Sequence, residues 1–244
     1  MSDYPPALPF DPPLEIAPNL FVVHGCVRAN LIARFSRNMA IVRDKGVLTL
    51  INPVRMDDAG LAQLEVLGEV KHVLRLGPLH GMDDPFYVDR YGAEFWSFPG
   101  GVTYTTPAID HRLSDAGELP FGDAQLFGFA HMKEPEGAIL LKRDGGILLT
   151  CDAIQSYATP PHLPHTNVFS KLVLPLIGFP KDTIIGPIWV KLLVEDETGI
   201  KREFQRLLSL PFEQLLSAHG TFLPSGAHAA VTAAYKKIFG SLPD

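Results

Sequence analysis

The sequence predicts an α+β fold, an αββα sandwich in which two mixed β-sheets pack face to face and helices cover the outer faces. Two observations predict this fold. Each half of the 244-residue chain begins with several short β-rich segments and continues with helical ones, and 46% of the residues are apolar. We expect a single domain over residues 1–244, with an extended N-terminal arm over 1–16 and a loop and helical insertion over 154–208.

The first half of the chain contains most of the β-rich segments. Turn residues separate some of these segments, which is typical of antiparallel strands. Asp57 stands at the N-cap position of a helix that we expect to end at Gly68. The expected strands are 20–25, 29–35, 39–44, 46–53, 70–76 and 93–98, with a second helix near 84–91.

The second half repeats the order of strands and then helices. Gly145 and Gly146 form a turn between two apolar segments, which predicts a hairpin. The expected strands are 123–130, 137–142, 147–153 and one that ends within 212–220, and the expected helices are 166–178, 184–195, 200–208 and 227–239.

Charge and composition exclude several classes of function. The chain has 21 basic and 27 acidic residues, a net charge of −6, and no basic run, so we expect no nucleic-acid partner. The longest apolar stretch, 168–194, is interrupted by charged residues and prolines, so it predicts no membrane span. The N-terminus does not look like a signal peptide, and we expect a soluble cytoplasmic protein.

Histidines and carboxylates follow the ends of several expected strands. Imidazole nitrogen and carboxylate oxygen suit zinc, iron or manganese, and loops at strand ends are where α/β scaffolds usually bind ligands. A lone histidine is more often structural, but the repeated placement after strands favours a shared site. The candidates are His80, Asp84, His131, Asp152 and His219.

The order of these residues resembles the metallo-β-lactamase superfamily. The segment 129–131 stands where that superfamily has a Gly-His-Thr turn, and 135–153 resembles its apolar hairpin ending in a bridging aspartate, here Asp152. Ser217-Ala218-His219-Gly220 resembles its last histidine turn. The resemblance covers about residues 17–225 and implies the αββα fold and a metal site.

The sequence departs from that superfamily in its His-x-His-x-Asp-His loop. With His80 as the first histidine, Asp84 falls on the aspartate, while Met82 and Pro85 replace the other two histidines. A second register places His80 second and Asp83 in the last histidine's position. In either register nitrogen ligands are missing, so the resemblance implies at most one metal ion.

A divergent branch is more similar. The segments 70–100 and 176–208 resemble the domain-of-unknown-function 4336 family, which implies the fold but no particular activity.

Two functions follow as hypotheses. The first is a hydrolase acting on a small molecule with one divalent metal, zinc before iron or manganese, in which Asp84 orients the attacking water. The second is a non-catalytic protein without metal that binds a small ligand or a protein partner, with the former site residues hydrogen-bonded to one another. Redox chemistry at iron is less favoured, because the full ligand set is missing.

Other features have simpler interpretations. The apolar region 168–194 predicts the roof of an apolar substrate pocket, a homodimer surface or ordinary core. His162 and His165 belong to a proline-rich loop and are interpreted as surface residues. Cys151 is interpreted as a small core residue whose side chain points away from Asp152, because neighbours in a strand alternate. The two cysteines, with no CxxC pair, indicate neither a disulfide scaffold nor a thiolate zinc site.

Overall fold

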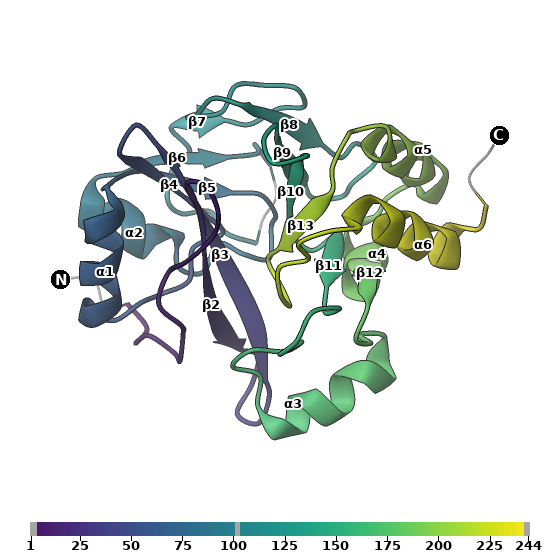
Figure 1. Cartoon of the computed structure of the whole chain (residues 1–244), viewed down its shortest axis with the longest axis horizontal. Coiled ribbons are helices and arrows are strands. Elements are labelled where there is room, and N and C mark those ends of the chain that lie inside the picture. Colours follow the sequence, from purple (N-terminus) through teal and green to yellow (C-terminus); the bar gives the residue numbers. More distant parts are fainter. Residues whose placement is uncertain (1–3, 101–102, 242–244) are drawn as a thin grey trace.

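The computed structural model describes residues 4–100 and 103–241. Two β-sheets face each other in the middle of the molecule, and helices lie on both outer sides (Figure 1). This arrangement confirms the predicted αββα sandwich. The first three residues of the predicted N-terminal arm lie outside the described residues, and the end of that arm contributes a strand, β1.

The first sheet has seven strands that lie in the order of the chain. Its first four strands pair antiparallel, and the pairs from β4 to β7 are parallel, so the sheet is mixed. The strands are β1 (Leu14–Ala17), β2 (Leu20–Arg28), β3 (Arg34–Asp44), β4 (Val47–Ile51), β5 (Glu69–Arg75), β6 (Glu94–Ser97) and β7 (His111–Arg112).

The second sheet has four strands in the order β13-β10-β9-β8. β10 pairs parallel with β13 and antiparallel with β9, so the end of β10 and the end of β13 lie side by side. A short separate pair, β11 with β12, follows the second sheet. These strands are β8 (Ala124–Gly128), β9 (Gly137–Leu141), β10 (Ile147–Thr150), β11 (Ile154–Ser156), β12 (Thr183–Ile185) and β13 (Gln214–Ser217).

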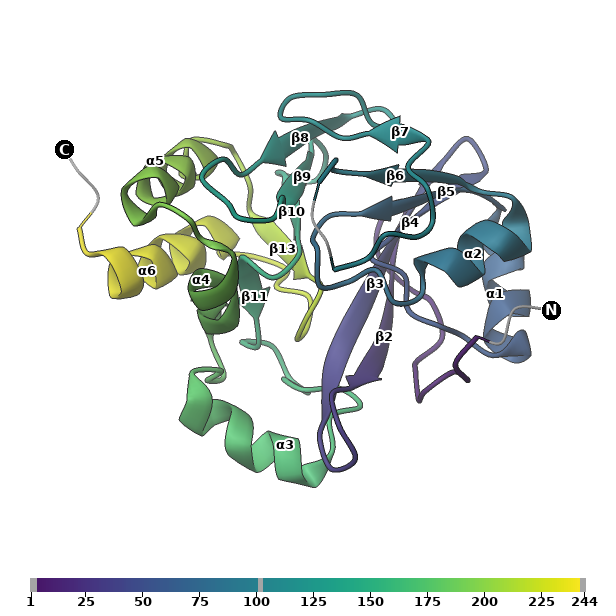
Figure 2. The ribbon, with the colours of Figure 1, turned by 180° about the vertical axis from the view of Figure 1, so that it is seen from behind.

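The helices cover the two outer faces separately. α1 (Asp58–Leu67) and α2 (Asp84–Tyr91) pack on the first sheet, where the side chain of Asp57 caps α1 as predicted. α4 (Pro187–Leu193), α5 (Glu197–Leu208) and α6 (Ala227–Phe239) pack on the second sheet (Figure 2). α3 (Val168–Val173) and the 3₁₀ helix η1 (Leu174–Ile177) lie near the tip of the β2–β3 hairpin.

The core has three apolar layers, as the sandwich requires. One layer joins the first sheet to α1 and α2, and another joins the second sheet to α4, α5 and α6. The middle layer lies between the sheets and includes Leu74, Leu76, Ile139, Leu149 and Leu216, each at most 2% exposed. β5, β10 and β13 all contribute to this layer, so the loops that follow them leave the core together.

Several predicted elements differ in the structure, and two of the differences have a clear local cause. Residues 29–33 form the hairpin tip rather than a strand, because the side chain of Asn30 accepts hydrogen bonds from the amides of Ile32 and Ala33 and closes a turn. The predicted helix 184–195 divides into β12 and α4, since Pro187 favours the first turn of a helix.

Within the described ranges, no helix is both long and apolar enough to cross a membrane.

Candidate functional site

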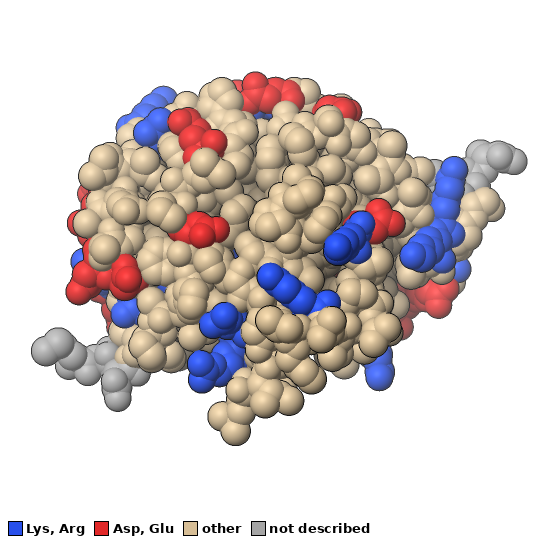
Figure 3. Space-filling view, turned by 60° about the horizontal axis from the view of Figure 1, so that its bottom comes forward, with Lys and Arg blue, Asp and Glu red and all other residues tan. Residues whose placement is uncertain are grey.

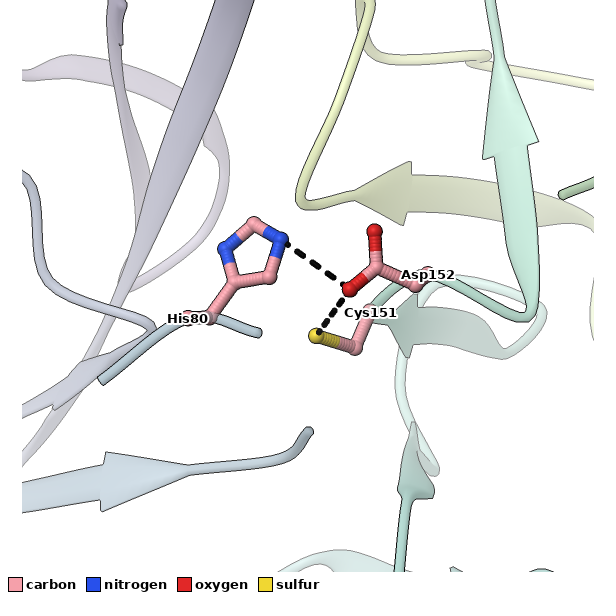
Figure 4. A group of neighbouring side chains, drawn as sticks. All are labelled: His80, Cys151 and Asp152. Carbon is pink, nitrogen blue, oxygen red and sulfur yellow. Dashed lines mark hydrogen bonds and ion pairs between the residues drawn. The ribbon is translucent and has the colours of Figure 1, made fainter. Parts of the chain in front are cut away.

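Three of the predicted site residues meet where the two sheets open. His80 follows β5, Asp152 follows β10 and His219 follows β13. His80 Nε2 lies 3.3 Å from Asp152 Oδ2, and His219 Nε2 lies 3.2 Å from Asp152 Oδ1. The two Nε2 atoms are 3.1 Å apart. Figure 4 shows how the ring of His80 and the carboxylate of Asp152 face each other from opposite sheets. We call these three residues the His–Asp–His cluster.

The backbone of β3 fixes the protonation of one histidine ring. His219 Nδ1 lies 2.6 Å from the carbonyl oxygen of Ser36. Because a carbonyl only accepts hydrogen bonds, Nδ1 carries a proton, and Nε2 is the ring nitrogen that faces Asp152. A histidine that donates from one nitrogen to a carbonyl and presents the other to a cluster is the usual arrangement of a metal ligand.

The charge states of the cluster also suit a cation. Burial lowers the pKa of His80 to about 4, so its imidazole is neutral near pH 7. Burial alone would raise the pKa of Asp152, but the interactions with His80 and His219 outweigh it and hold that pKa well below its usual range. Neutral imidazole and ionised carboxylate are the forms that bind metals.

The spacing of the donor atoms fits one metal ion. Ligands about 2.0–2.1 Å from a tetrahedral zinc ion lie about 3.3 Å from each other. The three distances within the His–Asp–His cluster are 3.1, 3.2 and 3.3 Å. Two nitrogens and one carboxylate also form a donor set that zinc, iron and manganese accept.

Cys151 lies directly beside this cluster. One ligand atom each of Cys151, His80 and Asp152 lies within 4.8 Å of the other two, close enough to share a metal ion. The Sγ atom of Cys151 lies 3.8 Å from Asp152 Oδ2 (Figure 4). The prediction that its side chain points away from Asp152 is wrong, because β10 ends at Thr150 and strand alternation stops there. Burial raises the pKa of the Cys151 thiol well above its usual value, which disfavours the thiolate that metals bind.

A polar run in β3, a strand of the first sheet, supports the cluster. Besides Ser36, the side chain of Arg37 donates to the carbonyl of His80 at 2.6 Å and to Asp83 at 3.0 Å. Asn38 Nδ2 donates to the carbonyls of Ser217 and Gly220, on either side of His219. These three residues are not among the predicted site residues, although three consecutive polar residues inside an apolar strand are a visible signal.

Two further residues that the sequence analysis missed hold Asp152. Gln155 Nε2 donates to the backbone carbonyl of Asp152 at 3.1 Å, and Tyr157 holds that amide by donating to Gln155 Oε1 at 2.7 Å.

Glu136 is fully buried, and its Oε1 accepts from the amide of Ala153 at 2.6 Å. Burial and the charge of Asp152 raise the pKa of Glu136 well above its usual value, which favours the protonated form of this side chain.

Asp84 is buried but has a different partner. Its Oδ2 accepts from Arg75 Nε at 2.6 Å, and the same guanidinium donates to the carbonyls of Tyr104 and Thr106. Burial raises the pKa of Asp84 to about 6, against the opposing effect of Arg75. Its neighbour Asp83 binds Arg37 and the amide of Arg55. The structure therefore places both carboxylates of this loop on arginines.

The structure does not bring His131 into the cluster. Its Nδ1 lies 3.6 Å from Asp196, the residue that caps α5, and both side chains are more than a third exposed. Its carbonyl accepts from the amides of Glu195 and Asp196. Met82 also stays apart from the donor atoms, and its exposed side chain lies at the rim of the neighbouring cavity.

A cavity of about 330 Å³ opens beside the cluster. His80, Asp152 and His219 form part of its wall, and residues of β2, β3, η1 and α4 form most of the remainder. Four of the lining residues belong to the apolar region 168–194, for which the sequence predicts a pocket roof, a dimer surface or core. They are Leu174, Ile177, Phe179 and Ile188.

Solved structures identify the fold. No family model and no curated protein matches the chain. The metallo-β-lactamase FIM-1 from Pseudomonas aeruginosa, in a mono-zinc form, is 12% identical with a TM-score of 0.65 over 96% of this chain and 97% of that one. A metallo-β-lactamase from Erythrobacter litoralis gives 0.58 at 11% identity, covering 93% and 92%.

A flavo di-iron protein mutant from Thermotoga maritima gives a TM-score of 0.62 at 16% identity, over 94% of this chain and 62% of its own. The chain therefore has the metallo-β-lactamase fold. The finer resemblance to the domain-of-unknown-function 4336 family has no matching family model behind it.

Proposed function

We propose that the protein is a hydrolase that uses a single divalent metal ion, with zinc the first choice, bound by His80, Asp152 and His219. The observation that carries this proposal is the convergence of two imidazole nitrogens and one carboxylate within 3.3 Å of one another. The fixed proton on His219 Nδ1 supports it, because the other ring nitrogen is then free to bind a cation.

The metal would supply two things when bound: a water with a pKa near 7 and a Lewis acid that polarises the scissile carbonyl or phosphoryl group. Residues of the chain would supply the charge that binds the metal and hold its ligands in position. Asp152 provides the negative charge, and Gln155 and Tyr157 hold its loop in place. Ser36 orients the ring of His219, and Arg37 holds the backbone of His80.

Arg37 is the one lysine or arginine among the described residues that line the cavity. Two of its guanidinium nitrogens bind Asp83 and the carbonyl of His80, while Nε has no partner among the described residues. A fixed positive charge beside the cluster favours a reaction in which negative charge develops on an oxygen of the substrate. Hydrolysis of an ester, thioester, lactone or lactam develops charge in this way.

The sequence predicts that Asp84 orients the attacking water. Its ion pair with Arg75 and its absence from the cavity wall favour a different role, the positioning of the loop that carries His80. We therefore propose that Asp84 acts on the site only through the backbone of residues 80–84.

The metal is tested first. Purified protein is stripped with a chelator, loaded separately with zinc, manganese or iron, dialysed and analysed for bound metal. We expect about one equivalent of zinc in the wild type and almost none in His80→Ala or His219→Ala, because each removes one of three ligands. The matched control is His111→Ala, a surface histidine paired with Glu94. Less than about a tenth of an equivalent of every metal in the wild type would refute the proposal.

Catalysis is tested next with the zinc-loaded protein on a panel of esters, thioesters, lactones, lactams and phosphodiesters. We expect turnover of at least one class, and its loss in His219→Ala but not in His111→Ala. Equal turnover by His219→Ala would contradict a metal-dependent mechanism.

A second candidate is a protein that binds a small ligand without chemistry. It is favoured by the loop 80–85, in which Met82 and Pro85 supply no nitrogen and both aspartates bind arginines. The three cluster residues would then stabilise each other by hydrogen bonds alone. A wild-type protein that binds no metal but keeps its fold would favour this candidate over the hydrolase.

A further inference from the structure

The cavity beside the His–Asp–His cluster has two chemically different ends. Apart from Tyr157, its polar lining residues are Ser36, Arg37, His80, Asp152, Gln155 and His219. Each of these either belongs to the cluster or holds a member of it through a hydrogen bond. The polar groups of the cavity are therefore gathered at the proposed metal site.

The rest of the wall is apolar and comes from segments that are distant in sequence. Val27, Ala29 and Phe35 come from the β2–β3 hairpin, and Leu79 and Met82 come from the loop after β5. The roof is formed by the four residues Leu174, Ile177, Phe179 and Ile188, which belong to η1, the loop after it and α4. Apart from Tyr157, the described residues at this end have no side chain that donates or accepts strong hydrogen bonds.

From this division we infer that the substrate is an amphiphile with a flexible apolar chain, such as an acyl group, which lies in the cavity while its cleavable polar group meets the cluster. The inference rests on the proposed function for the polar end only. A cavity of about 330 Å³ is at the lower end of the range for small-molecule sites, about 300–1,000 Å³. Its volume therefore suits a chain of medium length.

The apolar lining argues against a sugar, nucleotide or peptide in the same place. A polar group that enters such a cavity loses its hydrogen bonds to water and gains none from the wall. The charged group of Arg37 is already bound to Asp83 and to a backbone carbonyl. An alkyl chain has no hydrogen bonds to lose on entry, and the burial of its apolar surface stabilises the complex.

The mouth of the cavity is consistent with this substrate. Four large apolar lining residues are exposed to solvent: Leu79, Met82, Ile177 and Ile188. Methionine adapts its shape easily, so Met82 suits a chain that varies in length. Figure 3 brings the end of the molecule with α3 forward. Much of this face is uncharged, with separate Lys and Arg side chains, and the acidic side chains lie mainly toward its margins.

The test uses straight-chain 1-alkanols, from butanol to decanol, titrated calorimetrically into metal-free protein. We expect the affinity to rise about fourfold for each added methylene, which corresponds to about 0.8 kcal/mol, until the chain fills the cavity. The heat capacity change of binding should be negative, because apolar surface leaves water. An affinity that does not depend on chain length would overturn the inference.

Two substitutions on one helix locate the binding. Ile188 and Leu192 lie one turn apart on α4 and are about equally exposed, at 49% and 52%, but only Ile188 lines the cavity. We expect Ile188→Trp to weaken decanol binding at least tenfold and Leu192→Trp to leave it unchanged. Ile177→Trp, at another exposed lining position, provides a second blocking variant if Ile188→Trp does not fold. Equal affinities in Ile188→Trp and Leu192→Trp would place the chain elsewhere.

The two proposals fail separately. If alkanols bind and metals do not, the hydrolase is wrong and the cavity remains a site for an apolar chain. If metal binds and alkanols do not, the substrate has no apolar chain in this cavity. If a concentration-dependent dimer forms and Ile188→Trp abolishes it without affecting any alkanol, the cavity wall is an interface between copies and the inference is wrong.

Discussion

Asp84 and Asp152 are the same kind of residue in similar places, yet they have opposite surroundings. Both are buried, and both follow a strand whose side chains pack between the two sheets. Asp84 gives one oxygen to the guanidinium of Arg75 at 2.6 Å. Asp152 turns its two oxygens to the histidines His80 and His219. The two carboxylates therefore differ in their binding partners and not in their burial.

The difference in partners explains a difference in chemistry. A guanidinium is always charged and has only donors, so it permanently occupies the oxygen that it binds. A neutral imidazole can instead turn a lone pair toward the same cation that the carboxylate binds. Asp84 is therefore suited to holding a loop, and Asp152 is suited to holding a metal. Replacing each carboxylate by its amide tests this distinction directly.

Asp152→Asn should have the largest effect on metal binding. The amide keeps the size of the side chain but removes the negative charge, and amides are poor ligands for zinc. We expect zinc affinity to fall by more than about 100-fold, beyond what is usual for a residue outside the ligand set. Competition with a chromogenic chelator measures the affinity, and circular dichroism verifies that the variant is folded.

A zinc affinity within about tenfold of the wild type in Asp152→Asn would contradict a ligand role for this carboxylate.

Asp84→Asn should instead affect stability. It leaves the guanidinium of Arg75, 7% exposed as a residue, without its anion. Breaking a buried ion pair by removing one partner costs about 3–5 kcal/mol, and we expect the lower end because Arg75 keeps two carbonyl acceptors. Urea denaturation followed by fluorescence measures the free energy of unfolding.

Asp84→Asn should also leave zinc binding nearly unchanged, because Asp84 is not one of the proposed ligands. Its zinc affinity, measured on folded protein, should stay within about threefold of the wild type, far less than the change in Asp152→Asn. A loss as large as that of Asp152→Asn would show that Asp84 reaches the metal and that the ion pair with Arg75 does not define its role.

Most of the fold could be predicted from the sequence because each sheet and helix leaves a local pattern. Apolar strands, the cap at Asp57 and the glycine turn of the β9–β10 hairpin need no knowledge of distant residues. The hairpin tip 29–33 was predicted wrongly because its apolar residues resemble a strand. A single side chain, Asn30, decides that turn.

The candidate site was predictable only where a residue follows a strand of the central layer. His80, Asp152 and His219 meet because β5, β10 and β13 end close together. Spacing alone did not show that Asp84 pairs with Arg75 on β5, since an arginine in an apolar strand has no single interpretation. The contact between Ser36 and the ring of His219 is made by a backbone carbonyl, so residue type alone does not predict that contact.

Asn38→Ala tests support that comes from the opposite sheet. Its amide donates to the carbonyls of Ser217 and Gly220, and both hydrogen bonds hold the turn that carries His219. Losing a residue that orients a ligand typically costs 10–100-fold in metal affinity, and we expect about tenfold here. The matched control is Gln214→Ala, since Gln214 donates an amide to the carbonyl of Asp144, a loop residue apart from the cluster.

If Asn38→Ala and Gln214→Ala bind zinc with the same affinity, the polar run of β3 is a structural feature of the sheet and not a support for the ligands.

His131→Asn should have the smallest effect of these substitutions. Its zinc affinity provides the baseline with which the affinities of the cluster variants are compared. Asparagine tolerates the positive φ of 62° at this position, so the substitution removes the imidazole without straining the backbone. The pair with Asp196 is partly exposed and 3.6 Å apart, and such pairs contribute about 0–1 kcal/mol. We expect unfolding free energy to change by less than about 0.5 kcal/mol and zinc affinity to stay unchanged.

A fall in zinc affinity of more than about tenfold in His131→Asn would mean that this loop moves and delivers a nitrogen to the cluster. The site would then have a fourth protein ligand, and the contrast between the two carboxylates would be incomplete. An unchanged affinity would instead assign His131 to the start of α5, where its carbonyl and ring hold Asp196. The metal site would then be limited to the three residues that follow β5, β10 and β13.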